Sequence, residues 1–434
     1  MKIAYISHIL NIHDYRFLKK LSESQHRVWL ITHYRGKQLP TNIRNLPNVE
    51  IIHGYFRSKW NPRRYMDRQA LRLLAGHLLW RAYLGVTKRS PLVQKCVASR
   101  DWSQSDRWMI RMHAASGLRP YQCYHHLVGV LRHINPDLVH AGWVPADGLI
   151  TALAGFHPFL LMPWGSDILL EPVKSAQSMA RTRYTLGKAD MITCDCESVK
   201  KRVIELSGYP AEKIVVIPRG VDLSLFNPKC RGNSVRQKLG WEGKKVLIMT
   251  RALAPGYGIE FFLQALPNVI KQEPNARALL IGSGPLDSKL HDMATRLGLS
   301  NDVYFTGFIP NEQLPQYLNA ADVYVSTSLS DGTSLSLLEA MACGLPVVVA
   351  DVPSYFEWVQ EGANGFIVPR RDPDAVAERI LLLLKNADLA KRMGNRSLAI
   401  AEERANWQKN FAKIEQIYFD LIAQNRKGFI PAVL

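Results

Sequence analysis

Short apolar runs alternate with stretches of helical periodicity along almost the whole of this 434-residue chain. In the first half, strands are expected at residues 2–7, 28–32, 50–54, 138–141, 159–162, 191–194 and 213–217. In the second half, they are expected at residues 245–250, 278–282, 303–306, 322–326, 346–350 and 365–368. Strands that alternate with helices in this order are typical of doubly wound parallel sheets. The alternation therefore predicts an α/β chain of two tandem Rossmann-like domains, which face each other across a cleft at the carboxyl ends of their strands.

Helical segments fit between most of these strands. They are expected at residues 15–24, 197–207, 260–272, 286–297, 312–320, 334–343 and 373–386, with a last amphipathic helix at 407–424. The sequence IPRGVD at 217–222 interrupts the pattern with proline and glycine and marks the crossover between the two halves. We therefore expect an N-terminal domain over 1–217, a C-terminal domain over 218–405 and a final helix in 406–434 that packs back on the N-terminal domain.

Composition and the start of the chain bound the class of protein. Hydrophobic residues make up 47% of the sequence, which suits a globular chain with two cores. No run of eighteen apolar residues occurs, so we expect no transmembrane helix. The strand at 2–7 starts directly after the first methionine, so we expect no signal peptide. The six cysteines show no metal-ligand or redox spacing, which predicts reduced thiols in a cytoplasmic protein.

Almost all of the positive charge belongs to the first half of the chain. Residues 1–220 contain 32 Lys and Arg against 15 Asp and Glu, a difference of +17, whereas the net charge of the whole chain is +18. The excess is concentrated in an insert at 57–133, in which residues 57–132 hold 15 Lys and Arg, three acids and four Trp. This asymmetry predicts an anionic partner for the N-terminal domain.

Three partners suit the basic, aromatic insert. Its cations can meet anionic lipid headgroups while Trp and Leu enter the interface, which favours a peripheral position on the cytosolic face of a membrane. A solvated helical face is the alternative that any charged run allows. Nucleic acid also suits basic and aromatic side chains, but it is the least favoured of the three, and we expect none to bind.

The stretch 326–350 reads STSLSDGTSLSLLEAMACGLPVVVA and predicts a strand end, a polar loop, a short helix and an apolar strand. Within the expected helix, Glu339 is the only charged residue, and its neighbours are Leu, Ala and Met. A carboxylate in apolar surroundings is costly unless a partner hydrogen-bonds it. Because no cation lies one helical turn away, we expect a partner that is distant in sequence or a pair of ligand hydroxyls.

Three features of the second half follow successive strands. Gly282 and Gly284 follow one strand and open a helix, as in turns that bring backbone N–H groups close to a phosphate, although an ordinary tight turn explains them equally well. Thr333 and Ser334 begin another helix with free N–H groups. Arg251 follows a buried strand and suits phosphate oxygens, with a surface salt bridge as the alternative. Together, these features predict a nucleoside diphosphate site at the carboxyl edge of one sheet.

Several pieces of the sequence carry a resemblance to a known family. They are IPRGVDLSLF, the strand end at Arg251, IGSGP, VYFTGFIP, AADVYVSTS, SDGTSLSLLEAMACGLPVVVADV and NGFIVP. With them the chain resembles the retaining GT-B glycosyltransferases of glycosyltransferase family four. The resemblance runs along nearly the whole chain and is most specific in the second half. It implies that the C-terminal domain binds a nucleotide-sugar donor and that the N-terminal domain binds a hydroxyl acceptor.

The resemblance also implies roles for single residues on the donor side. The family's two spaced acids fall on Asp331 and Glu339, of which Asp331 is expected to contact hydroxyls of the donor sugar and Glu339 to hold the ribose hydroxyls. The base is expected to lie against Phe308 and Ile309. The residues expected near the pyrophosphate are Gly332, Thr333, Ser334 and Leu335.

Two donor-side positions depart from the family pattern. Asp331 is one methylene shorter than the family's Glu, which implies a different placement or identity of the sugar. Tyr257 falls where the family has a phosphate-binding Lys, and a tyrosine supplies no full positive charge. Arg251 is therefore expected to carry more of the leaving-group charge, helped by Arg219.

The acceptor side departs from the family as well. The N-terminal glycine-rich turn is replaced by a segment that contains His13 and Asp14. The family's His-Gly-x-Asp motif appears as Trp164-Gly165-Ser166-Asp167, so the histidine is lost and the acid remains. We expect His13, Asp14 and Trp164 on the acceptor side, and we count Asp167 with Arg251 and Asp331 as a catalytic residue.

The reaction that the resemblance implies is sugar transfer with retention of anomeric configuration. The sequence shows no Asp-x-Asp at a strand end and no His, Asp and Glu cluster with ligand spacing, so we expect neither a metal nor another cofactor. The acceptor is expected to be lipid-linked or a polysaccharide in cell-surface glycan synthesis. Two alternatives are a membrane-associated nucleotide-sugar-binding subunit without turnover, and a nucleotide-sugar epimerase or hydrolase on the same fold.

Overall fold

The computed structural model describes residues 1–7, 12–32, 39–53, 127–229, 232–425 and 428–429. The chain forms two compact units. Unit 1 contains Met1–Cys194, Val199–Val216 and Ile414–Leu434, and unit 2 contains Asp195–Ser198 and Ile217–Lys413. Most of the predicted basic insert, up to residue 126, lies outside the described residues.

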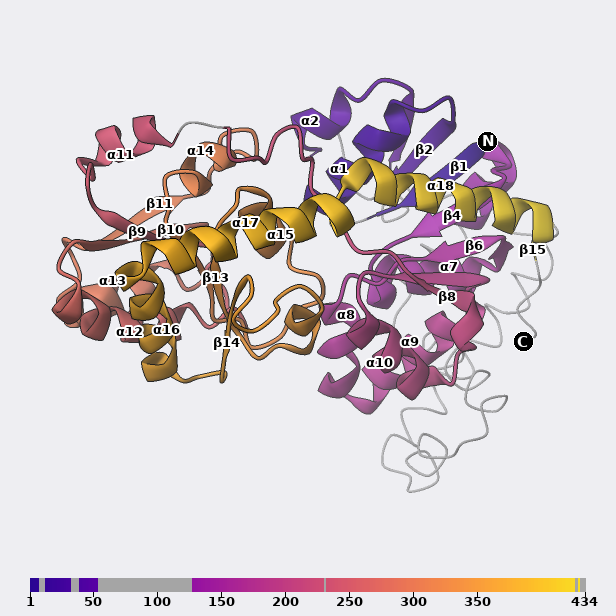
Figure 1. Cartoon of the computed structure of the whole chain (residues 1–434). Helices are drawn as coiled ribbons and strands as arrows, with labels where there is room; N and C mark the ends of the chain where they lie inside the picture. Colours follow the sequence, from indigo (N-terminus) through magenta and orange to yellow (C-terminus); the bar gives the residue numbers. More distant parts are fainter. Residues whose placement is uncertain (8–11, 33–38, 54–126, 230–231, 426–427, 430–434) are drawn as a thin grey trace. The chain divides into compact units, whose positions relative to one another are not determined.

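Unit 1 is built on a parallel sheet. Within the described residues the sheet has seven strands in the order β3-β2-β1-β4-β6-β7-β8, and every pairing is parallel (Figure 1). The strands are β1 (Lys2–Ile6), β2 (Arg27–Thr32), β3 (Val49–His53), β4 (Leu138–Ala141), β6 (Phe159–Leu161), β7 (Met191–Cys194) and β8 (Ile214–Val216).

The described helices of unit 1 connect these strands. They are α1 (Ile12–Ser22), α2 (Thr41–Arg44), α7 (Leu149–Ala154), α8 (Ser166–Leu169), α9 (Ala176–Lys188) and α10 (Glu197–Ser207), with the π-helix η3 (Val144–Gly148) and the short 3-10 helices η4 (Pro172–Lys174) and η5 (Ala211–Lys213). A short antiparallel pair joins β5 (Phe156–His157) to β15 (Gly428–Phe429). The sequence predicted α1 and α10, but it did not predict α7. The reason is that nearly every residue of α7 is buried, so the segment has no polar face to reveal a helical period.

Unit 2 repeats the architecture with a second parallel sheet. In its described part the sheet has six strands in the order β11-β10-β9-β12-β13-β14. The strands are β9 (Lys245–Thr250), β10 (Ala276–Ile281), β11 (Val303–Gly307), β12 (Val323–Ser326), β13 (Val347–Ala350) and β14 (Gly365–Val368). The helices are α11 (Asn233–Leu239), α12 (Ile259–Gln272), α13 (Asp287–Arg296), α14 (Leu314–Leu318), α15 (Leu335–Ala342), α16 (Pro373–Lys385) and α17 (Ala387–Arg404), and the 3-10 helix η6 (Pro353–Glu357) follows β13.

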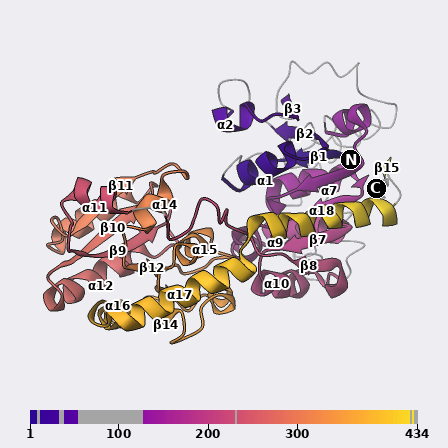
Figure 2. The same cartoon turned by 45° about the horizontal axis from the view of Figure 1, so that its top comes forward.

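Both faces of the unit 2 sheet are buried. Along β9, Val246 and Ile248 contribute to one core cluster while Leu247 and Met249 contribute to the other, because successive side chains of a strand point to opposite faces. Helices α12 and α16 lie side by side over one face, and α15 and α17 cover the other (Figure 2). A parallel strand that is covered twice has to be apolar throughout, which explains the run of valines in β13.

The predicted strands agree with the observed ones to within two residues at either end. The α/β fold of two Rossmann-like domains is thereby confirmed. Among the described residues, no helix combines the length and the apolar character that crossing a bilayer requires.

Helix α18 (Trp407–Gln424) begins in unit 2, and from Ile414 onward it belongs to unit 1. In unit 1 the Tyr418 hydroxyl lies 2.7 Å from Nδ1 of His140, on strand β4. The His140 ring packs edge-on against Tyr5 of β1, with ring centroids 5.1 Å apart. These contacts attach the second half of α18 to the centre of the first sheet.

The buried His140 makes the stability of unit 1 depend on pH. Burial lowers the pKa of its imidazole to about 3, whereas the unfolded chain binds a proton at this site below about pH 6.5. Because acid then favours the unfolded state, we expect the unfolding free energy to fall between pH 6.5 and 3, by on the order of 2 kcal/mol at pH 5. Urea unfolding at pH 7 and pH 5 measures this change.

The matched variant is His140→Gln, whose side chain does not titrate. It is expected to be less stable than the wild type at pH 7 but to lose less of its stability on going to pH 5. An equal loss in both proteins would show that His140 does not cause the dependence.

Candidate functional site

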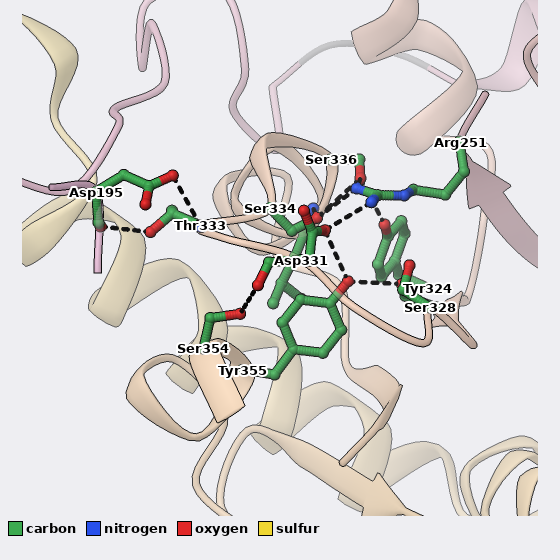
Figure 3. Close-up of polar contacts among 12 residues, drawn as sticks. Asp195, Arg251, Tyr324, Ser328, Asp331, Thr333, Ser334, Ser336, Ser354 and Tyr355 are labelled. Carbon is green, nitrogen blue, oxygen red and sulfur yellow. Dashed lines mark hydrogen bonds and ion pairs between the residues drawn. The ribbon is translucent and has the colours of Figure 1, made fainter. Parts of the chain in front are cut away.

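Polar side chains gather at the carboxyl ends of neighbouring strands in unit 2 (Figure 3). Arg251 directly follows β9, and Ser328 follows β12. Asp331 lies in the loop between β12 and α15, while Tyr355 lies in η6 after β13. Since the carboxyl ends of parallel strands meet at one edge of a sheet, residues far apart in sequence come together here.

Arg251 is the centre of this group. Its Nη2 forms an ion pair with Oδ2 of Asp331 at 2.6 Å, and the two side chains are only 9% and 18% exposed. Its Nη1 donates to Oγ of Ser334 at 2.8 Å and to Oγ of Ser336 at 3.0 Å. The guanidinium also lies 4.1 Å from the centre of the Tyr257 ring, in a cation–π arrangement. The cation is therefore held in one orientation.

The Arg251 guanidinium stays charged at any working pH. Burial alone would lower its pKa, but the Asp331 carboxylate and nearby tyrosine hydroxyls raise the pKa above the ordinary arginine value. The site therefore keeps a fixed positive group with oriented N–H donors. The sequence left a surface salt bridge as the alternative for Arg251, and the ion pair that the structure shows is mostly shielded from solvent.

Asp331 is held from its other side by η6. The Tyr355 hydroxyl donates to Oδ2 of Asp331 at 3.1 Å, and the Ser354 hydroxyl donates to the Asp331 carbonyl oxygen at 3.1 Å. Neither Tyr355 nor Ser354 was predicted from the sequence. A Tyr and a Ser after a strand carry no signal by themselves, and only the fold brings them beside Asp331.

The loop that precedes α15 is bound to Asp195, which the sequence reasoning also missed. The Thr333 N–H donates to Oδ2 of Asp195 at 3.1 Å, and the Thr333 hydroxyl donates to the Asp195 carbonyl at 2.5 Å. A Cβ on Gly332 would lie 2.8 Å from Oδ2 of Asp195, so a glycine is needed there. Asp195 precedes Thr333 by 138 positions, and it belongs to unit 2 as part of the short segment Asp195–Ser198.

The segment Asp195–Ser198 is attached to unit 2 at both ends. Besides the contacts of Asp195, the Glu357 carboxylate of η6 accepts the N–H groups of Glu197 at 3.0 Å and of Ser198 at 3.4 Å. These two residues form the start of α10, where a carboxylate is favoured by the helix dipole. The loop before α15 and this segment therefore hold each other in place.

Arg219 is engaged by the same buried acid. Its Nε lies 3.5 Å from Oδ2 of Asp195, and the two side chains are 12% and 5% exposed. Burial raises the pKa of Asp195, while the Arg219 charge and the Thr333 N–H act in the opposite direction. The structure thus places Arg219 in an ion pair with Asp195, whereas Arg251 pairs with Asp331.

The glycine turn after β10 lies against the end of β9. A Cβ on Gly282 would lie 2.0 Å from the carbonyl oxygen of Arg251, and one on Gly284 would lie 2.4 Å from that of Leu253. The Leu253 N–H donates to the Ser283 carbonyl at 3.0 Å. The two glycines therefore allow the turn to approach the backbone that positions Arg251.

The other residues that the sequence predicts for the nucleotide-sugar site lie on neighbouring elements. Glu339 is buried in α15 with 5% exposure, and Phe308 is 74% exposed directly after β11. Ile309 packs against a core cluster, and Leu335 is the first residue of α15. An exposed aromatic ring at a sheet edge is available for stacking on a flat ligand.

The predicted acids of unit 1 are buried and hold structure around them. Asp167 accepts the N–H of Val144 through Oδ2 at 3.0 Å and that of Trp164 through Oδ1 at 2.8 Å. Asp14 accepts the Tyr5 hydroxyl at 2.9 Å. Both acids are fully buried. His13 lies in α1, but its side chain is outside the described part of the structure.

The Trp164 ring lies against Gly142, where any larger residue would clash with it. A Cβ on Gly142 would lie 2.7 Å from Nε1 of Trp164, and the Trp164 ring packs edge-on against Trp143 at 5.9 Å. Across the described residues, no three His, Cys, Asp or Glu side chains gather as they would around a metal ion.

Two family models match the sequence. Residues 233–399 match "Glycosyl transferases group 1", and residues 97–225 match "Glycosyltransferase Family 4". The chain is 26% identical over 301 residues to the D-inositol 3-phosphate glycosyltransferase of Streptomyces bingchenggensis, covering 66% of each chain. It is 29% identical over 249 residues to the GDP-mannose-dependent alpha-(1-6)-phosphatidylinositol monomannoside mannosyltransferase of Mycolicibacterium smegmatis, covering 55% of this chain and 65% of that one. The matches thus span just under two thirds of these relatives' own lengths.

Solved structures show the same fold. The Anabaena protein HepE, solved in complex with UDP, aligns with a TM-score of 0.72 at 20% identity over 97% of this chain and 100% of that chain. The sucrose-phosphate synthase of Thermosynechococcus elongatus aligns with a TM-score of 0.71 at 20% identity over 98% of this chain and 99% of that chain.

The buried ion pair predicts a strong energetic coupling. Arg251→Met leaves a buried carboxylate without its cation, so we expect it to destabilise unit 2 by on the order of 3 kcal/mol. Asp331→Asn leaves the opposite charge without its partner and is also expected to be destabilising. The double variant should lose less than the sum of the two single losses, as measured by urea unfolding.

Arg370→Met is the control within the same unit. Arg370 pairs with Asp351, but the two side chains are 44% and 40% exposed, so we expect a loss below about 1 kcal/mol. Additive losses for Arg251 and Asp331 would contradict a coupled pair.

Proposed function

The chain belongs to the glycosyltransferases of family 4, and from this premise we propose that it transfers a sugar from a nucleoside-diphosphate sugar to a hydroxyl acceptor, with retention of configuration. The observation that carries the proposal is the buried Arg251, held by Asp331 and two serines at the carboxyl edge of the second sheet. A fixed cation beside a helix start suits a diphosphate leaving group.

We assign the donor to the residues around this cation. Arg251, the N–H groups of Gly332, Ser334 and Leu335 and the turn at 282–284 would hold the diphosphate. The Thr333 N–H, which the sequence predicted to be free, is bonded to Asp195 instead. Glu339 would hold the ribose hydroxyls. Phe308, whose ring is exposed, would stack on the base with Ile309 beside it. Asp331 would contact a hydroxyl of the donor sugar.

The proposed reaction depends on stabilising the negative charge that develops on the leaving diphosphate. As the bond between the anomeric carbon and the diphosphate breaks, negative charge grows on the phosphate oxygens, and the preoriented guanidinium stabilises it. The acceptor oxygen bonds to the anomeric carbon from the face that the leaving group vacates, and its proton passes to a phosphate oxygen. No step in this reaction requires a metal ion, and we propose that the transfer is metal-independent.

The acceptor proposal rests on sequence and relatives. The names of two relatives contain an inositol phosphate and a phosphatidylinositol mannoside. The basic insert at 57–132 would bring the enzyme to an anionic membrane surface on the cytosolic side, where a lipid-linked acceptor is available. Asp14 and Asp167 would then shape the acceptor side through the groups they hold, with Trp164 and His13 nearer to the acceptor.

One observation favours a second function, that of a binding subunit without catalytic turnover. Tyr257 stacks on Arg251 but adds no full charge where the family has Lys, which suits a nucleotide-sugar-binding subunit without turnover. Release of nucleotide from the donor separates this alternative from the transferase. A thermal-shift screen with UDP, GDP, ADP and their sugars first identifies the nucleotide.

Turnover is then measured with the donor that stabilises the protein. We expect release of nucleotide in the presence of an acceptor, with the product anomer matching that of the donor by NMR, and with an unchanged rate in EDTA. Arg251→Ala is expected to lower the rate at least about a hundredfold. Binding without any release would support the subunit instead.

Loss of the Glu339 carboxylate is expected to weaken nucleotide binding. A charge-assisted hydrogen bond contributes about 1.5–3 kcal/mol, so Glu339→Gln should raise the dissociation constant of the free nucleotide by a factor of about 10 or more, as measured by calorimetry. Glu402→Gln, at an exposed position of α17, is the matched control and should bind normally. Equal affinities for both variants would remove Glu339 from the ribose site.

A further inference from the structure

Two hydrogen-bond donors contact the same carboxylate oxygen of Asp331. Nη2 of Arg251 lies 2.6 Å from Oδ2, and the Tyr355 hydroxyl donates to the same oxygen at 3.1 Å. Within the described residues, the structure shows no hydrogen bond to Oδ1 of Asp331. The carboxylate therefore has one oxygen that is occupied and one that can accept a hydrogen bond from a ligand.

The side chain of an aspartate does not fix its own orientation. The torsion that turns the carboxylate is broad and roughly two-fold, so a single partner leaves the second oxygen poorly placed. Two donors, one from the end of β9 and one from η6, restrict this rotation. Ser354 adds a bond to the Asp331 carbonyl, so the backbone is held as well.

Tyr355 is itself rigid. Its side chain is fully buried in a core cluster, and its hydroxyl also lies 3.1 Å from Oγ of Ser326, at the end of β12. Burial raises the pKa of Tyr355, and the nearby Asp331 charge raises it further, so the phenol keeps its proton. The hydroxyl is therefore a permanent donor delivered from a fixed position.

We infer that Tyr355 is a positioning residue that, with Arg251, turns Asp331 so that Oδ1 faces a hydroxyl of the donor sugar, and that it thereby sets which sugar is accepted. The inference deepens the proposed function and rests on it. Asp331 is one methylene shorter than the Glu of the family. Its side chain therefore has one rotatable bond fewer, so the carboxylate has less freedom to adjust its position to the sugar. A shorter acid needs a fixed orientation to distinguish one hydroxyl from its epimer or from a missing hydroxyl.

The test is Tyr355→Phe, which keeps the ring and removes the hydroxyl. The variant is assayed with the donor found by the screen, with its epimers and with deoxy analogues. We expect unchanged affinity for the free nucleotide, a kcat about tenfold lower for the preferred donor, and a ratio of kcat/KM between preferred and altered donors that narrows at least about fivefold. A merely structural role would lower kcat/KM equally for all donors.

Two further variants keep the test decisive. In an Asp331→Ala background, Tyr355→Phe should have no additional effect on the donor ratio, because Tyr355 acts through Asp331. If Tyr355→Phe fails to fold, Ser326→Ala replaces it as the test, because it removes the other hydrogen-bond partner of the Tyr355 hydroxyl. This variant should also narrow the ratio of kcat/KM between preferred and altered donors, by a smaller factor.

The matched control is Tyr209→Phe in unit 1, which loses a buried hydroxyl bond to the Ala189 carbonyl of 3.0 Å. This control should keep the wild-type ratio of kcat/KM between preferred and altered donors.

If Tyr355→Phe also keeps that wild-type ratio, the inference is overturned and the proposed function stays intact. A wild-type protein that turns over no nucleotide sugar overturns the proposed function, and the inference falls with it.

Discussion

The arrangement of unit 2 around the end of β9 depends on the buried ion pair between Arg251 and Asp331. Removing both charges from water is expensive, and the attraction between them offsets that cost only if the geometry is good and the remaining donors are used. Here Ser334, Ser336 and the ring of Tyr257 complete the surroundings of the cation. The pair joins the end of β9 to the loop before α15, so the two elements cannot shift independently. A buried pair of this kind specifies an arrangement more than it adds stability.

The fold was largely predictable because strands in both sheets are buried on both sides, as β1 and β2 of unit 1 and β9 and β13 of unit 2 are along almost their whole length. Strands such as β9 and β13 then read as unbroken apolar runs, separated by helices with polar outer faces. Among the helices that the sequence did not predict, α7 lacks such contrast. Helix α7 is buried almost throughout, and α17 follows α16 with only Asn386 between them as a cap, so the sequence shows no glycine or proline to separate them.

The site was predictable only where residues follow strands in one sheet. Arg251 was placed at this edge by the rule that parallel strands share their carboxyl ends, whereas Asp331 was expected there from the family resemblance, and the structure brings the two into direct contact. Asp195 and Tyr355 were not predictable, because their partners lie across long stretches of chain and their own neighbours carry no motif. The charges of Arg219 and Asp167 could be noted from the sequence, but the buried groups that engage them could not.

The segment Asp195–Ser198 has a consequence for recombination between related enzymes. Although it stands among residues of the first unit, it carries the acid that binds the loop of Thr333 and the amides that Glu357 accepts. A chimera joined at residue 217 would inherit the loop from one parent and its anchor from the other. Swapping unit 2 intact therefore requires moving this short upstream piece together with it.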